Sequence, residues 1–376
     1  MALEEKMNIE LEGAFAHQVR RLAITMGLTH ETVVQMGIAT LAASPIAATL
    51  PQSESRFIPT REISRLDARD IVKSDSQVAE VLAEELHQEL DTAYSPYMDA
   101  WPMLHRDNLN FTQSSLWAVD QNPKPESEYI LWGQFSRFLP IKFTLRILAF
   151  AYEKSDEVTL GEWQSIVGSE APQFRNYLRV LDVLFKLRRG EQMASGFPKD
   201  TEKSKERFAR HFCGDIFSNG QLVGMPAHLG LIVCEGDVIR FTPRGLEYVK
   251  AENPVMDEKE PYANLGPEVG TISPDEMDVL LECLRTHLPS EYRFMWNVLR
   301  WIKAGNNTPL SLSGKVEEIY GSKMNWNTDQ ASTYRGGAIG RLGELKLITR
   351  SWQFRSVTYQ VESSWENLPH PDEVVE

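Results

Sequence analysis

The spacing of apolar residues over positions 1–119 predicts a helical N-terminal region. Residues 14–26 and 29–43 carry apolar side chains at the three- and four-residue intervals of an amphipathic helix. Residues 75–90 show this pattern most clearly, with a large aliphatic side chain at every fourth position from 78 onward. Residues 7–12 alternate apolar and polar side chains, which is the period of a strand. We therefore expect the chain to begin with a short strand followed by helices.

The strand, helix, turn and helix expected at 7–43 resemble a ribbon-helix-helix or helix-turn-helix unit. In ribbon-helix-helix proteins the outward-facing strand residues enter the major groove, and here these are Asn8, Glu10 and Glu12. Carboxylates repel the phosphates that dominate binding to DNA. We therefore favour a dimerisation or docking element, or an ordinary helical domain, over DNA recognition in this region.

Two segments have the composition of linkers. Residues 120–128 are polar and proline-bearing, and residues 253–272 hold three prolines, two glycines and an excess of acidic side chains. Because the C-terminal part has a capped start and apolar helices of its own, we expect it to fold alone. The expected division is a helical region at 1–119, a middle part at 129–252, a C-terminal part at 273–363 and an acidic tail at 364–376.

The pattern of the middle part predicts three helices in succession. Residues 141–152 are apolar, Thr159 is placed to cap a helix at 160–167, and Pro172 is placed to start a third helix. A third helix with long polar side chains on its outer face is the arrangement in which a recognition helix enters a groove of DNA. The residues of that face are Gln173, Arg175, Asn176 and Arg179.

The rest of the middle part predicts a weak helix at 220–231, a hairpin at 232–241 turned at Gly236, and a helix after Thr242. The run LGLIVCEGDVIRFTPRGLEYV, residues 229–249, resembles the wing and closing helix of prokaryotic winged-helix regulators. This resemblance implies a winged-helix fold, with either one unit or two in the middle part. It does not imply a ligand, because winged helices also bind proteins.

The C-terminal part predicts a second arrangement of this kind. Ser273 and Glu276 form a capping box with proline between them, and further helices are expected at 291–303, 315–320 and 329–345. Strands at 347–350 and 357–361 would pair as a wing. Three glycines in the last helix lower its helix propensity by roughly 1 kcal/mol each, and they allow another backbone to approach closely, either that of a packed segment or a phosphate. These glycines are Gly336, Gly337 and Gly340.

Charge singles out the C-terminal part as the expected DNA interface. Residues 285–355 hold eleven Lys and Arg against five Asp and Glu, a net of +6 in a chain whose net charge is −14. The remainder of the chain therefore carries −20, which opposes DNA binding elsewhere. The expected contacts to phosphates and base edges are Gln330, Ser332, Thr333, Arg335 and Arg341 on the helix, and Arg350, Gln353 and Arg355 on the wing.

Composition narrows the class of protein. The chain has 376 residues, 42% of them hydrophobic, which is enough for two or three packed domains. Its three cysteines have no C-x-x-C spacing, so neither a disulfide framework nor a structural zinc site is expected. No signal-peptide pattern is visible, and no apolar run is long enough to cross a bilayer. We expect a cytoplasmic protein of mainly α class with small β-hairpins.

No catalytic constellation is recognisable. The chain lacks a P-loop, a G-x-S-x-G elbow and an H-E-x-x-H motif. Glu84 and His87 have the spacing of a carboxylate-bridged metal site, but a second copy of that motif is missing. Glu344 and Lys346 match a short nuclease motif that arises by chance in chains of this size. We therefore expect no enzymatic activity, no metal and no cofactor.

Two functions follow from the sequence. The first is a non-catalytic protein that binds double-stranded DNA, either a winged-helix regulator or the DNA-reading subunit of a larger complex such as a defence or restriction system. The second is a scaffold whose winged helices dock other proteins and whose acidic surface keeps DNA away. Protein partners or self-association are expected in both cases.

Overall fold

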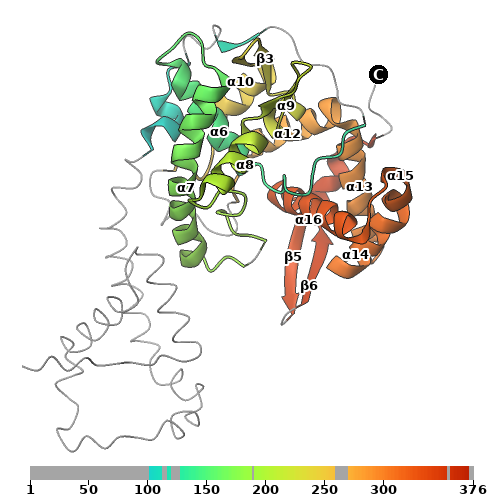
Figure 1. The fold of residues 1–376 in the computed structure, drawn as a ribbon. Coiled ribbons are helices and arrows are strands. Elements are labelled where there is room, and N and C mark those ends of the chain that lie inside the picture. The colour runs from blue at the N-terminus through green and yellow to red at the C-terminus, as the bar shows by residue number, and fades with distance from the viewer. Residues whose placement is uncertain are drawn as a thin grey trace, which may run out of the picture. The chain divides into compact units, whose positions relative to one another are not determined.

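Figure 1 shows the computed structural model, which describes residues 101–111, 117–119, 128–188, 190–258, 270–353 and 356–371. Residues 93–376 form one compact unit. The strand, helix and helix expected at 7–43 and the helix expected at 75–90 lie outside the described residues, as does nearly all of the linker expected at 120–128.

Helices dominate this unit, and strands among the described residues pair as three antiparallel two-stranded hairpins. The expectation of a mainly helical chain with small hairpins is confirmed. The first elements in chain order are η2 (Pro102–Leu104), η3 (Arg106–Asn108), α6 (Leu139–Tyr152), α7 (Leu160–Leu184), α8 (Glu202–Phe212), β1 (Asp215–Ile216), β2 (Leu222–Val223), α9 (Met225–His228), β3 (Ile232–Glu235), β4 (Val238–Phe241) and α10 (Pro243–Lys250). The later elements are α12 (Pro274–His287), α13 (Pro289–Lys303), α14 (Pro309–Val316), the π-helical turn η5 (Glu317–Gly321), α15 (Ser322–Met324), α16 (Thr328–Glu344), β5 (Ile348–Gln353), β6 (Ser356–Val361) and η6 (Ser363–Asn367).

Helix α7 corrects the prediction of two helices separated by a turn. It begins at the predicted cap, where Thr159 and Glu162 form a capping box, and then continues for 25 residues through Pro172. Its buried positions recur at helical intervals on both sides of the proline, so packing holds one continuous helix. The hydrogen bond lost at Pro172 is the one to Gly168, which lines an open groove. The middle part therefore has no helix-turn-helix at 160–185.

A short extended stretch precedes α7 and joins the hairpin β3–β4. The amide of Ile239 donates to the carbonyl of Val158 at 3.0 Å, and Thr159 bridges antiparallel to Val238. The hairpin has its predicted turn, with Gly236 in the left-handed region at φ +71°. The first group of elements is therefore α6, a strand-like stretch, α7, α8 and a hairpin whose last strand pairs with that stretch.

The weak helix expected at 220–231 is replaced by β2 and the single turn α9. Gly224 is extended, and a Cβ added there would lie 2.7 Å from the Cα of Gly214, which brings the two glycines into close backbone contact. Gly230 has φ +68° and ends the turn. Glycine placement therefore breaks this segment into a strand and a turn.

The C-terminal elements repeat the same order. Helix α13 is followed by Asn307, whose carbonyl accepts a hydrogen bond from the amide of Tyr359 on β6 at 2.8 Å. Helices α14 and α16 come next, and then the hairpin β5–β6. The helix expected at 315–320 begins earlier, because Thr308 caps α14, and it opens into the π-helical turn.

The segment expected to link these two groups lies in the core where it is described. Asn253 is fully buried, and its side-chain amide donates to the carbonyl of Thr271 at 3.0 Å and to both carboxylate oxygens of Glu276. Val255, Met256 and Ile272 are also buried. Residues 253–258 and 270–272 therefore pack as parts of one core instead of separating two domains. The acidic tail likewise packs where it is described, since Trp365 contacts Trp296 with ring centroids 4.8 Å apart.

Two ion pairs on α6 join the groups. Lys142 lies 3.0 Å from Glu276 of α12, and both side chains are fully buried. Arg146 donates to both oxygens of Asp257, at 3.1 and 2.9 Å. Burial lowers the pKa of Lys142 to about 8 and raises the pKa of Glu276, because the interior disfavours either charge and the partner offsets only part of that cost.

These contacts reverse the expectation that the C-terminal part folds alone. A fragment of residues 270–376 would leave Glu276, Glu291 and Glu344 without partners from α6 and the chain before it. We predict no cooperative urea or thermal transition for this fragment by circular dichroism. A fragment of residues 93–376 is the control, and it should unfold cooperatively because it contains the whole unit. A cooperative transition of the shorter fragment would contradict this prediction.

Candidate nucleic-acid interface

An extended segment of the chain crosses helix α16, the predicted recognition helix, on the face that holds Gly337 and Gly340. We call residues 129–138 the strap. A Cβ added at Gly337 would lie 2.6 Å from the Cα of Gly133, and one added at Gly340 would lie 2.5 Å from the carbonyl oxygen of Ser136. These glycines therefore allow the approach of the chain's own backbone. Gly336 borders open space.

Buried charged side chains hold the strap on α16. Arg341 donates to the carbonyl of Phe135, and Glu291 accepts the amide of Leu131 at 2.9 Å. Glu344 accepts the amides of Phe138 and Leu139, where α6 begins. A carboxylate at a helix N-terminus is favourable because it satisfies free amides and faces the positive end of the helix dipole.

Arg341 is therefore not a DNA contact. Its side chain is fully buried, and its guanidinium lies 2.6 Å from Glu291, which is equally buried. Burial raises the pKa of Glu291, and the Arg341 charge opposes that change. The sequence predicted Arg341 as a contact to DNA, but the strap covers this side chain.

The N-terminal half of α16 keeps its other predicted residues at the surface. Gln330 and Thr333 are exposed, while Ser332 and Arg335 are half-buried. Gln330 closes the capping box with Asn327, accepting that residue's amide at 3.0 Å. The hydroxyl of Thr333 donates to the carbonyl of Asp329 at 2.8 Å. Helix α16 thus presents polar side chains from a well-capped end.

The hairpin β5–β6 projects from the same unit beside α16 (Figure 1). Gln353 is exposed near its tip, and Arg355 lies outside the described residues. Arg350 sits at the hairpin base, where it donates to the carbonyl of Ile339 at 3.1 Å. Burial and the nearby Arg137 lower its pKa. Arg350 is thus a packed side chain with limited exposure, and not the freely exposed wing contact that the sequence predicted.

The segment after α7 reaches the hairpin. The Arg188 guanidinium lies over the ring of Trp352, 5.7 Å from its centroid, and Arg188 is exposed. A Cβ added at Gly190 would lie 3.7 Å from the Arg350 guanidinium. Cations from the middle part and from the wing therefore gather at one place, although they are more than 150 residues apart in the chain.

The secondary set lies within α7. Gln173 and Asn176 are exposed, and Arg175 and Arg179 are half-buried. Burial, with Arg179 nearby, lowers the pKa of Arg175. These residues occupy the middle of a long helix, so they do not have the position of a third helix that the sequence indicated.

Helix α8 was missed as a candidate. Lys203, Arg207 and Arg210 are exposed and lie on one face at intervals of four and three residues. Phe208, Ala209 and Phe212 are buried on the other face. This alternation of basic and apolar positions was a readable signal in the sequence. It follows α7 in the first group as α16 follows α14 in the second.

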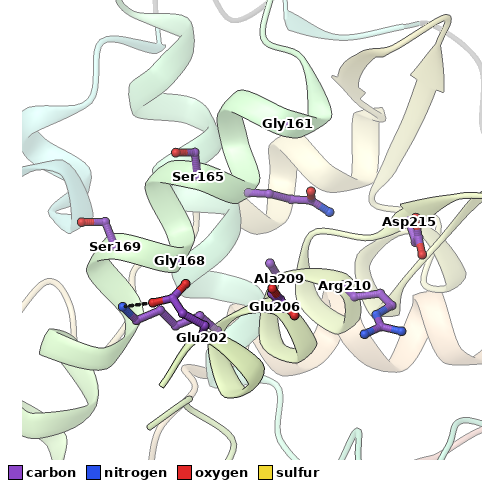
Figure 2. Close-up of a pocket in the computed structure, with 11 residues that line it drawn as sticks. Gly161, Ser165, Gly168, Ser169, Glu202, Glu206, Ala209, Arg210 and Asp215 are labelled. Atoms are coloured by element: carbon purple, nitrogen blue, oxygen red, sulfur yellow. Dashed lines mark hydrogen bonds and ion pairs between the residues drawn. The ribbon is translucent and has the colours of Figure 1, made fainter. Parts of the chain in front are cut away.

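A groove of about 650 Å³ separates α7 from α8 (Figure 2). Gly161 and Gly168 leave its α7 wall open, since a Cβ at either would meet no neighbour within 4 Å. Lys205 on the α8 side pairs with Asp200 at 2.8 Å and Glu202 at 3.2 Å. The charge of Lys205 is thus balanced by two exposed carboxylates of the protein itself.

The described residues contain no group of three or more His, Cys, Asp and Glu side chains placed to hold a metal ion. Burial raises the pKa of the Cys283 thiol to about 12 and that of Cys213 well above its usual range, so both stay protonated. No helix in the described part of the chain is long and apolar enough to span a bilayer. No family model, curated protein or solved structure matches this chain.

The Arg341–Glu291 pair predicts a structural role for a residue that the sequence placed at the interface. Arg341→Met should destabilise the protein by about 3–5 kcal/mol, because it leaves Glu291 charged and buried without its partner. Adding Glu291→Gln should recover part of this loss. Urea unfolding measures both effects.

Arg335→Met is the matched control on the same helix. It should cost about 1 kcal/mol or less, because Arg335 is half-buried and has no ion pair with a described residue. If the Arg341→Met protein were as stable as wild type but had lost its affinity for DNA, Arg341 would be a DNA contact and this prediction would be wrong.

Proposed function

We propose that this protein binds double-stranded DNA without catalysis, through two winged-helix units arranged in tandem. The support is the repeated order of elements. Each group has a helix, a strand-like stretch, two further helices and a hairpin, and in each the stretch pairs with the second strand of the hairpin. The first group has β1, β2 and α9 inserted between α8 and its hairpin β3–β4, and the second has η5 and α15 inserted between α14 and α16. In winged helices of this order, the helix before the hairpin enters the major groove and the hairpin contacts the backbone.

The observation that best supports DNA binding is which charged side chains of residues 285–355 point into the core and which lie outside it. Two of the five acidic side chains there, Glu291 and Glu344, are buried and have partners inside the protein. Arg341 is the fully buried cation. Outside the core, nine described Lys and Arg side chains therefore face three acidic ones, Glu317, Glu318 and Asp329. The described residues of this range hold ten Lys and Arg and five acidic side chains, a net of +5, and burial of two acids and one cation raises the net charge outside the core to +6.

The second unit should carry most of the affinity. The turn of the first hairpin holds Glu235 and Asp237, both exposed, which would repel a phosphate backbone. The second hairpin instead exposes Thr349, Ser351 and Gln353, which can donate hydrogen bonds to phosphate oxygens. Arg188 from the middle part adds a cation at this hairpin.

A regulator and a DNA-reading subunit of a larger complex both fit this interface. One observation favours an additional protein partner, or the scaffold as the second function. Leu310 on α14 is 85% exposed and Ile319 in η5 is 44% exposed, so two large aliphatic side chains lie at the surface of consecutive elements. Both residues belong to the second unit. A partner protein would therefore leave the hairpin β5–β6 free for DNA only if it approached from the side of α14.

Removing the exposed Arg188 and the half-buried Arg335 should weaken binding to every sequence. For Arg188→Ala with Arg335→Ala, the slope of log K against log salt should flatten by up to about 2, since each phosphate contact contributes roughly 0.9. Fluorescence anisotropy with a random blunt duplex, at several salt concentrations, measures the slope.

The control removes two cations from α10, which lies at the opposite end of the unit from the hairpin β5–β6 (Figure 1). Arg244→Ala with Lys250→Ala changes the net charge equally and should leave the salt slope unchanged. Equal slopes for both variants would refute the placement. A wild-type protein that binds no duplex would reject DNA binding in favour of the scaffold.

A further inference from the structure

Trp132 is the large hydrophobic side chain of the strap that is exposed, at 46%. Leu131 and Phe135 are buried, and the amide of Phe135 donates to the carbonyl of Trp132 at 2.9 Å. Glu291 accepts the Leu131 amide on the other side. The backbone at Trp132 is therefore fixed on both sides, and its ring is held at the surface.

The strap at this point lies between α8 and α16. On one side, the Trp132 ring meets the ring of His211 in α8 edge-on, with centroids 6.0 Å apart. On the other side, the next residue, Gly133, packs on Thr333 of α16, where an added Cβ would lie 2.1 Å from the carbonyl oxygen. Trp132 thus joins the two proposed recognition helices into one continuous surface.

Two arginines accompany the ring. Arg207 and Arg210 of α8 are exposed and form no ion pair with any described residue. Both act electrostatically on His211, whose pKa burial and these two charges lower to about 4. His211 is therefore neutral at physiological pH and adds no further charge. The surface combines one exposed indole ring with two free guanidinium groups.

We propose that Trp132 stacks on an unpaired base of DNA, while Arg207 and Arg210 bind the phosphates of the same strand. This inference rests on the proposed function and specifies its substrate as duplex DNA with an adjoining single-stranded stretch. An aromatic side chain beside a basic groove is the usual platform for single strands, because every base presents a π-face. Bases within an intact duplex have both faces covered by their neighbours, so only an unpaired base can stack on Trp132.

The full chain is tested on a blunt duplex and on the same duplex with a thymidine tail. Wild type should bind the tailed duplex more tightly than the blunt one. Trp132→Ala should weaken binding to the tailed duplex by about 5- to 150-fold and leave the blunt duplex unchanged. Trp132→Phe should retain most of the affinity, since it keeps an aromatic ring.

Phe217→Ala is the matched control, because Phe217 is 53% exposed on the loop between β1 and β2. It should leave both affinities unchanged. Arg207→Ala with Arg210→Ala should flatten the salt slope on a free thymidine oligonucleotide by up to about 1.4, since each contact on a single strand contributes roughly 0.7. Thermal unfolding of each variant should match wild type, because all of these side chains are exposed.

Equal affinity of wild type and Trp132→Ala for the tailed duplex would overturn the stacking inference while leaving duplex binding intact. If the protein binds the thymidine oligonucleotide in a manner that depends on Trp132 but does not bind the blunt duplex, the stacking inference would be supported. The proposal that the protein binds double-stranded DNA would then be rejected. Absence of binding to all three DNAs would overturn both proposals.

Discussion

The ionic contacts of Arg341, Glu291 and Glu344 are the constraint on which the arrangement of this unit depends. They tie α16 to the strap and to the beginning of α6, so that the two groups of helices share one core. Charges are expensive to bury, and replacing a buried pair by apolar side chains is often neutral or stabilising. Their value here lies in position: a carboxylate that accepts two backbone amides fixes the start of a helix in one place, which an apolar side chain cannot do.

This constraint also separates the charges inside the protein from those on its surface. Lys142, Arg146 and Arg341 point into the core and neutralise carboxylates there. The cations left outside belong mainly to the C-terminal elements and to α8, around two hairpins of opposite character. One hairpin turn is acidic and the other hairpin is rich in hydroxyl and amide groups. The same fold can thus present a repulsive and an attractive edge to a polyanion.

Local signals in the sequence predicted the local structure well. The capping boxes at Thr159 and Ser273 and the hairpin turned at Gly236 all form as expected. The errors came from long-range packing. Pro172 looked like a helix start, but the apolar stripe continues past it. Arg341 looked like a surface cation because nothing local shows that residues 129–138 cross α16. Asn253 looked like a linker residue because its partner Glu276 belongs to another element. Helix α8 differs from these cases, because its pattern of basic residues on one face and apolar residues on the other is local and can be read from the sequence.

A shared core has a consequence for the geometry of any site that both groups contact. Independent domains joined by a flexible linker can adjust to different distances between their targets, whereas two groups fixed through the strap cannot. The separation and rotation between α8 and α16 are set by the protein, so the proposed DNA binding would require a duplex that meets both helices in one helical phase. Inserting half a helical turn, about 5 base pairs, between two contacted positions would turn one of them to the opposite face of the duplex. Under the proposed function, the strap would make the spacing between the two contacted positions part of what the protein recognises.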